Sequence, residues 1–88
     1  SAAVPNSFVP RDQVKTRVLN ILTNFEELKQ SPESIQTDTP LSKTGIDTVD
    51  FEKFTKAVNN EFSISTLTSK YNTIEAIVDF VSKQSNAK

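Results

Sequence analysis

The 88-residue chain has no cysteine, histidine, methionine or tryptophan, and its only glycine is Gly45. Without cysteine it can form no disulfide and offers neither a thiol nucleophile nor a thiolate metal ligand. Without histidine it lacks the usual general base at neutral pH and the commonest metal ligand. A single glycine is too few for a glycine-rich phosphate-binding loop. These absences argue against an enzyme, and we expect no bound metal.

The charge balance and the hydropathy exclude two further classes of partner. The chain has 10 Lys+Arg against 11 Asp+Glu, a net charge of −1, which argues against a nucleic-acid partner held by bulk positive charge. Arg11, Lys15 and Arg17 form a small basic patch, which we interpret as solvated helix surface because three charges are too few for nucleic-acid affinity. No apolar run approaches the roughly 20 residues that span a bilayer, so we expect no direct membrane span.

Apolar residues recur at helical spacing in three segments, and no strand-like alternation is present. The first predicted helix covers residues 11–25, the second runs from residue 47 or 48 to residue 62, and the third occupies residues 73–81. The residues predicted to form the core of the bundle are Val14, Val18, Ile21, Phe54, Val58, Phe62, Ile77 and Val81. This pattern predicts an all-α fold, a bundle of three longer helices plus one short helix with a long loop between helices 1 and 2.

The segments between the helices carry turn and capping signals. Ser31-Pro32-Glu33 resembles an N-cap followed by proline at the first helical position. The polar residues 63–71 leave room for at most one helical turn, and Asn72 with Glu75 resembles a capping box for the last helix.

The predicted domain organisation has three parts. Residues 1–10 are expected to form an extended N-terminal arm, in which Phe8 and Val9 can anchor on the body, and residues 11–83 the helical domain. Residues 84–88 are expected to form a flexible tail.

The second predicted helix carries residues that resemble a known family. They are Gly45-Ile46-Asp47-Thr48-Val49-Asp50 at the head of the helix and Glu61-Phe62 at its end. The head is similar to the G-x-D-S-L motif of acyl carrier proteins, and the spacing to the acidic residue and the phenylalanine is also similar. Residues 14–25 and 73–81 resemble the opening and closing helices of that family, so the resemblance covers about residues 12–83 and is closer to the mitochondrial branch.

The resemblance implies an acyl-carrier-protein-like bundle and singles out Thr48. This residue stands where the family has the serine that receives phosphopantetheine. Threonine also has a hydroxyl, but its extra methyl group crowds the oxygen and restricts χ1. We therefore expect Thr48 to be unmodified, with no cofactor, and interpret it, like Asp47, as a helix-capping residue. The chain is a divergent member if the resemblance holds.

In the family, the outward face of this helix docks on basic grooves of enzymes and of LYR-motif proteins. Here the outward positions carry Val49, Glu52, Lys53, Lys56, Asn59 and Asn60. The residues predicted to bind a partner are Asp47, Val49, Glu52, Lys53, Lys56 and Asn60. The two lysines would repel a basic groove, so we interpret this face as a rewired docking site, with a plain solvated surface as the alternative for any single charge.

The segment before Tyr71 is about three residues shorter than in the family, and the usual acidic third helix is replaced by STLTSK. That helix forms one wall of the acyl pocket in carriers, so its shortening argues against a sheltered fatty chain. The phenylalanines at positions 51, 54, 62 and 80 are interpreted as core filling rather than as a ligand site.

The resemblance therefore favours a non-catalytic acyl-carrier-like accessory subunit of a mitochondrial assembly, such as respiratory complex I, on the matrix side. Its implied partner is an LYR-motif-type subunit. The alternative is a functional carrier of mitochondrial fatty-acid synthesis with phosphopantetheine on Thr48. A third reading is a free-standing interaction module with no link to the organelle.

Overall fold

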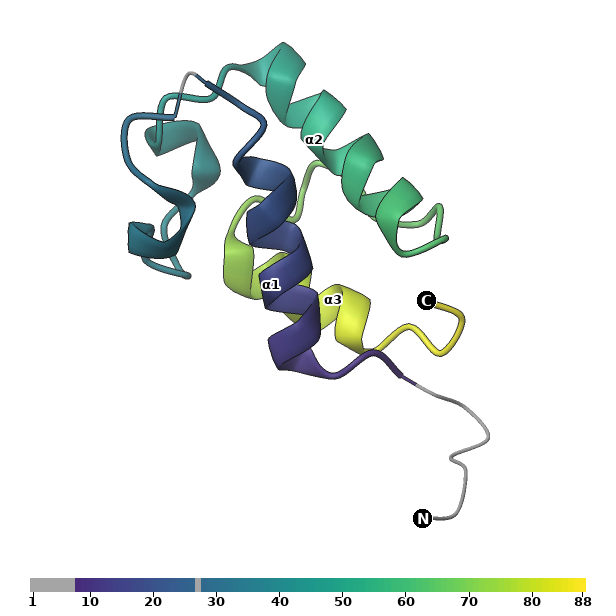
Figure 1. Cartoon of the computed structure of the whole chain (residues 1–88). Helices are drawn as coiled ribbons and strands as arrows, with labels where there is room; N and C mark the ends of the chain where they lie inside the picture. Colours follow the sequence, from purple (N-terminus) through teal and green to yellow (C-terminus); the bar gives the residue numbers. More distant parts are fainter. Residues whose placement is uncertain (1–7, 27) are drawn as a thin grey trace.

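The computed structural model describes residues 8–26 and 28–88. These residues form three α-helices and no strand: α1 (Arg11–Leu22), α2 (Thr48–Glu61) and α3 (Ile74–Ser82). Helix α1 packs against both α2 and α3 and is the central element of the molecule (Figure 1). The prediction of a small all-helical bundle with three longer helices is confirmed.

The core lies between the three helices and contains the predicted residues. Seven of the eight are buried, and Ile21 is partly buried against them. The fully buried side chains are Val14, Val18, Leu22, Leu41, Phe54, Val58, Phe62, Ile74, Ile77 and Val81. The phenylalanines divide as a packed core requires: Phe54 and Phe62 are fully buried, while Phe51 and Phe80 pack against the core from its edge.

Helix α1 ends at Leu22, three residues before the predicted end at Phe25. The backbone N–H groups of Asn24 and Phe25 donate to the carbonyls three residues earlier, at 3.1 and 3.0 Å. Such short-range bonds tighten the last turn and end the α-helical ladder. The side chain of Phe25 still packs on the core from this turn.

The connection between α1 and α2 contains two short 3₁₀ turns, η1 (Pro32–Ser34) and η2 (Leu41–Lys43). The side chains of Ile35, Leu41 and Ile46 are buried and fix the connection to the body. Gly45 has a φ of 106°, which a residue with a Cβ atom rarely adopts. The single glycine of the chain therefore makes the turn that leads into α2.

Helix α3 begins one residue later than a capping box at Asn72 requires. The N-cap is Thr73, whose Oγ1 accepts the Ala76 N–H at 3.0 Å. The N–H of Glu75 donates to the Thr37 carbonyl at 2.9 Å instead of joining a local cap. The interpretation of Asn72 as the cap was therefore wrong, because the Thr73 hydroxyl accepts the N–H that a capping residue binds.

The two ends of the described chain also contact the body. Val9 is buried, Phe8 is half-exposed, and residues 1–7 of the predicted arm lie outside the described residues. At the other end Ala87 is buried, and the Lys88 N–H donates to the Phe62 carbonyl at 2.9 Å. The last residues therefore lie against the end of α2.

Candidate functional site

The head of α2 brings together the residues that resemble the carrier motif. Asp47 is the N-cap of α2, and its Oδ1 accepts the Asp50 N–H at 2.8 Å. The negative charge of this carboxylate also suits the positive end of the helix dipole. Thr48 is the first residue of the helix and is exposed. The interpretation of Thr48 as a cap was therefore wrong, because Asp47 fills that position and Thr48 is the exposed residue that follows it.

A surface pocket of about 440 Å³ opens beside Thr48. Its apolar part is formed by Ile46, which is 4% exposed, and by the half-buried Phe51. The polar residues around it are Ser42, Asp47, Thr48, Glu52, Ser69 and Asn72. The pocket thus combines a small apolar floor with hydroxyl and carboxylate groups. We call it the Thr48 pocket.

The predicted partner-binding residues follow one side of α2 from its head. Val49, Glu52, Lys53, Lys56 and Asn60 are all exposed, and we call these five residues the α2 face. Val49 has the most exposed large apolar side chain among the described residues, at 62%. The exposed Lys53 lies 3.9 Å from the carboxylate of the partly buried Asp50, a long ion pair that contributes little to stability. The α2 face therefore carries an apolar side chain and two lysines on a helix whose opposite side is packed on α1.

Asn59 does not share this exposed position, although the sequence placed it on the outward side of the helix. It is half-buried, its Nδ2 donates to the Leu67 carbonyl and its Oδ1 accepts the Leu67 N–H, both at 3.0 Å. Asn59 thereby holds the segment after α2, which contributes Ser69 and Asn72 to the Thr48 pocket. The signal in the sequence was its place beside the buried stripe, next to Val58 and three residues before Phe62.

Residues 63–72, which we call the strap, contain no helix. Their apolar side chains Ile64 and Leu67 are nevertheless buried. The ring of Tyr71 packs on Phe80 with a centroid distance of 4.6 Å, so the lone tyrosine attaches the end of the strap to α3. The strap forms one wall of the Thr48 pocket without the third helix that carriers possess.

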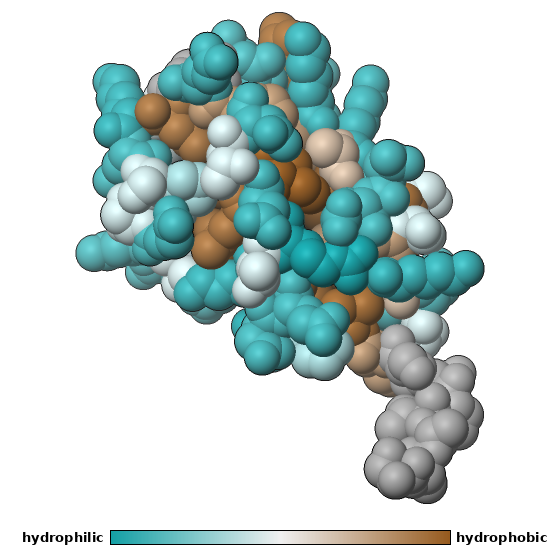
Figure 2. All heavy atoms as spheres, viewed as in Figure 1, coloured by the Kyte–Doolittle hydropathy of each residue, from teal (hydrophilic) through white to brown (hydrophobic). Residues whose placement is uncertain are grey.

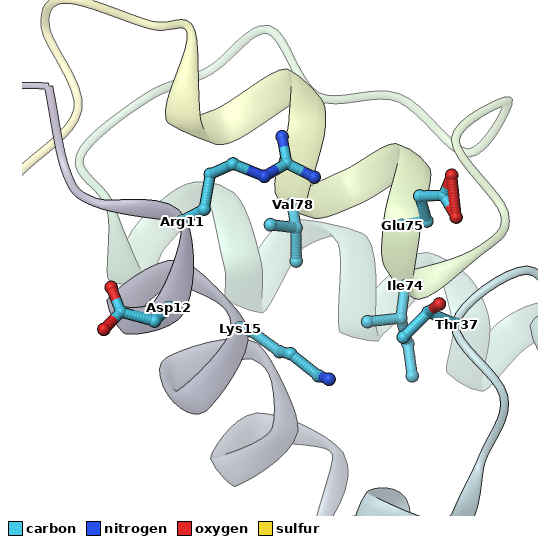
Figure 3. A pocket seen from close by; sticks show the side chains of 7 residues that line it. All are labelled: Arg11, Asp12, Lys15, Thr37, Ile74, Glu75 and Val78. Atoms are coloured by element: carbon cyan, nitrogen blue, oxygen red, sulfur yellow. The ribbon is translucent and has the colours of Figure 1, made fainter.

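The basic residues of α1 serve structural contacts more than an open binding surface. Arg11 pairs with Asp79 at 3.0 Å, and Arg17 pairs with Glu61 at 2.7 Å. Arg11 and Lys15 of α1 also line a smaller pocket of about 280 Å³, together with Ile74 and Val78 of α3 (Figure 3). Ile74 and Val78 are 1% and 5% exposed, and the charged side chains of Arg11, Asp12, Lys15 and Glu75 also line this pocket.

Hydrophilic side chains cover most of the face seen in Figure 2, with apolar atoms showing between them. Among residues 8–26 and 28–88, no helix is long and apolar enough to cross a membrane. The same residues hold no group of three or more acidic side chains placed to bind a metal ion. The head of α2 offers three exposed residues: Asp47, Thr48 and Val49.

The chain matches no protein-family model and no curated protein. The resemblance to acyl carrier proteins therefore stays a prediction that rests on the residues of α1, α2 and α3 themselves.

Proposed function

We propose that this protein is a non-catalytic, acyl-carrier-like accessory subunit that docks on a protein partner through the α2 face. The observation that supports this most directly is Val49, which exposes 62% of its surface at the head of a helix packed on only one side. Burying such a side chain against a partner is favourable by about 1 to 2 kcal/mol. A permanent partner would also stabilise so small a domain by mass action.

The identity of the proposed partner comes from the resemblance to acyl carrier proteins. An LYR-motif-type subunit in a mitochondrial assembly, such as respiratory complex I on the matrix side, is the partner that the family's habit implies. The charges of the α2 face modify that expectation. Lys53 and Lys56 stand side by side in the middle of the face, so the partner's surface opposite them must carry fewer cations than a basic groove does.

Substitution of Val49 by aspartate tests the docking proposal. The tagged chain is expressed in cells of its natural source, and native mass spectrometry measures the stoichiometric complex that it forms. We expect Val49→Asp and Lys53→Glu to lose this complex while the isolated protein stays folded, because both side chains are exposed. Asn20→Asp, an exposed change on α1, is the matched control. A complex that survives both α2 substitutions would contradict docking through this face.

A second function, a carrier loaded on Thr48, is favoured by one observation: Thr48 is exposed, lines a pocket and is not the N-cap of the helix. In that reading Thr48 would hold phosphopantetheine, whose thiol carries acyl groups, and the Thr48 pocket would receive part of the arm. The methyl group on the same Cβ atom opposes it. Intact mass of the native protein decides, because a phosphopantetheine arm that disappears in Thr48→Ala would establish the carrier function.

A further inference from the structure

The charged side chains in the first three turns of α2 divide into two groups. Asp47, the N-cap, and Glu52 line the Thr48 pocket. Lys53 and Lys56 follow in the middle of the helix, and both are exposed. The acidic groups therefore lie beside the pocket, while the positive charge occupies the middle of the α2 face.

The positive charge of these two lysines is weakly compensated within the chain. Lys53 reaches the Asp50 carboxylate only at 3.9 Å, and Lys56 makes no ion pair within the part of the chain that the structure describes. The ion pairs that join α1 to α3 and α1 to α2 are much shorter, at 3.0 and 2.7 Å. A carboxylate from outside can therefore bind Lys53 and Lys56 without breaking a contact that holds the helices together.

A partner that buries Val49 also covers the two lysines. On a helix of 3.6 residues per turn, these three side chains lie within about 60° around the axis, with the lysines about 6 and about 10 Å beyond the valine. Val49 exposes 62% of its surface, and the Lys53 side chain exposes 69%. Covering an ammonium group without supplying a partner for it costs free energy. A surface that gains from burying Val49 therefore needs carboxylates opposite Lys53 and Lys56.

We propose that the partner presents an apolar pocket for Val49 and, next to it, aspartate or glutamate side chains for Lys53 and Lys56. This chemistry of the partner rests on the proposed function, docking through the α2 face. Two lysines are too few to hold a nucleic acid or an anionic membrane by charge alone, which assigns the carboxylates to a protein. Hydrogen bonds from lysine to carboxylate are strengthened by charge and fix the orientation in which the two surfaces meet.

Neutral and charge-keeping substitutions test for the carboxylates. Tagged Lys53→Gln/Lys56→Gln is expressed beside the untagged wild-type chain in cells of the natural source, and mass spectrometry measures the ratio of the two chains in the isolated complex. We expect the glutamine variant to be depleted at least about tenfold relative to a tagged wild type, because both carboxylates lose their partner. Lys53→Arg/Lys56→Arg keeps the charge and should stay within about threefold. Lys15→Gln/Lys29→Gln removes the same charge from exposed positions outside α2 and should stay within about twofold.

Val49→Asp, measured in the same way, separates this proposal from docking itself. Loss of Val49→Asp from the complex with undiminished binding of the glutamine variant would leave docking intact and overturn the acidic surface. Enrichment of the glutamine variant would assign a cationic surface to the partner and overturn it as well. A complex that retains both variants would contradict docking through the α2 face.

A carbodiimide, which couples lysine amines to carboxylates in direct contact, gives a second readout on the isolated wild-type complex. We expect a cross-link from Lys53 or Lys56 to an acidic residue of the partner. A complex in which neither lysine forms such a link would overturn the proposal.

Discussion

At the scale of single residues, Phe54 is one of the two phenylalanines that are fully buried in the interior. Its side chain is fully buried in the middle of α2. Its ring meets Phe25 edge-on at a centroid distance of 6.0 Å and lies 6.1 Å from Phe51. Such aromatic contacts add to the free energy gained by burial. Phe54 thus joins the turn after α1 to Phe51 near the head of α2, where the candidate site lies.

Replacing Phe54 by alanine should therefore destabilise the protein by about 3 to 5 kcal/mol, because it leaves a cavity in a closely packed core. Urea denaturation followed by circular dichroism measures the change. Val49→Ala is the control on the exposed side of the same helix and should change stability by less than about 0.5 kcal/mol. A nearly normal unfolding midpoint for Phe54→Ala would show that the interior does not depend on this ring.

Arg17 stabilises the contact between α1 and the end of α2 in three ways. Its Nε donates to Glu61 Oε2 at 2.7 Å and its Nη2 donates to the Glu61 carbonyl at 2.9 Å. Its guanidinium also lies 4.1 Å from the centre of the Phe62 ring. The planar group thus satisfies a carbonyl that the helix end leaves without a partner.

Arg17→Lys keeps the charge and loses the planar fork, so we expect a loss of about 1 to 2 kcal/mol in unfolding free energy. Thermal unfolding of this variant beside Lys15→Ala measures it, since Lys15 is exposed on the same helix. Equal stability of both variants would mean that the guanidinium contacts contribute nothing beyond charge.

At the scale of elements, the N-cap of α3 differs from the one that the sequence predicts. Asn72 and Thr73 are both good capping residues, and the presence of Glu75 favoured a box that began at Asn72. In the structure Thr73 is the cap, and the backbone on either side of it bonds to the connection before α2, through Leu41 and Thr37. These long-range bonds leave no trace in local sequence.

The two candidate caps can be distinguished by substitution. Thr73→Ala removes the acceptor of the Ala76 N–H and should cost about 1 kcal/mol. Asn72→Ala should change stability by less than about 0.5 kcal/mol, because only its side chain is lost and its carbonyl still accepts the Leu41 N–H. Chemical denaturation of both variants measures the difference, and the reverse order of costs would restore Asn72 as the cap.

An ion pair between Arg11 and Asp79 also links helices α1 and α3. The hydrogen bond from Lys83, followed by that from Arg11, lowers the pKa of the Asp79 carboxyl below its usual 3.8. Because the pKa is lower in the folded state, the stability that this group contributes is present above pH 3.8 and is lost as the pH falls through the folded pKa.

Asp79→Asn therefore tests this link through its pH dependence. The melting temperature of the wild type should exceed that of the variant at neutral pH, and the gap should close as the pH falls from about 5 to about 2. The gap is expected to be small because the pair is exposed and screened by solvent. A gap that is the same at all pH values would assign the difference to a cause other than ionisation.

Helical periodicity made the three helices and seven of the eight core residues predictable. The position of Thr48 at the head of α2 followed from the same pattern. Three features could not be predicted because they depend on contacts between distant segments. They are the bridge from Asn59 to Leu67, the bonds of Arg17 to the end of α2, and the buried position of Ala87. Asn59 in particular was assigned to the outward face of the second helix, together with the residues of the expected docking surface.

At the scale of the whole molecule, α1 holds the other two helices, and the outer side of α2 stays open (Figure 1). Apolar burial is modest in a domain of this size, so its stability is marginal without a partner. Val49, the two lysines of the α2 face and the Thr48 pocket all lie on or beside this open side. The molecule therefore presents one helix for docking while the rest of the fold supports it.

The proposed function requires that the protein docks on a partner and that its Thr48 is unmodified. Native mass spectrometry of the protein isolated from its natural source tests both parts most directly. We predict a complex of defined stoichiometry that releases, on denaturation, a chain without any added group on Thr48. A free monomer, or a chain that carries a phosphopantetheine arm on Thr48, would contradict the account.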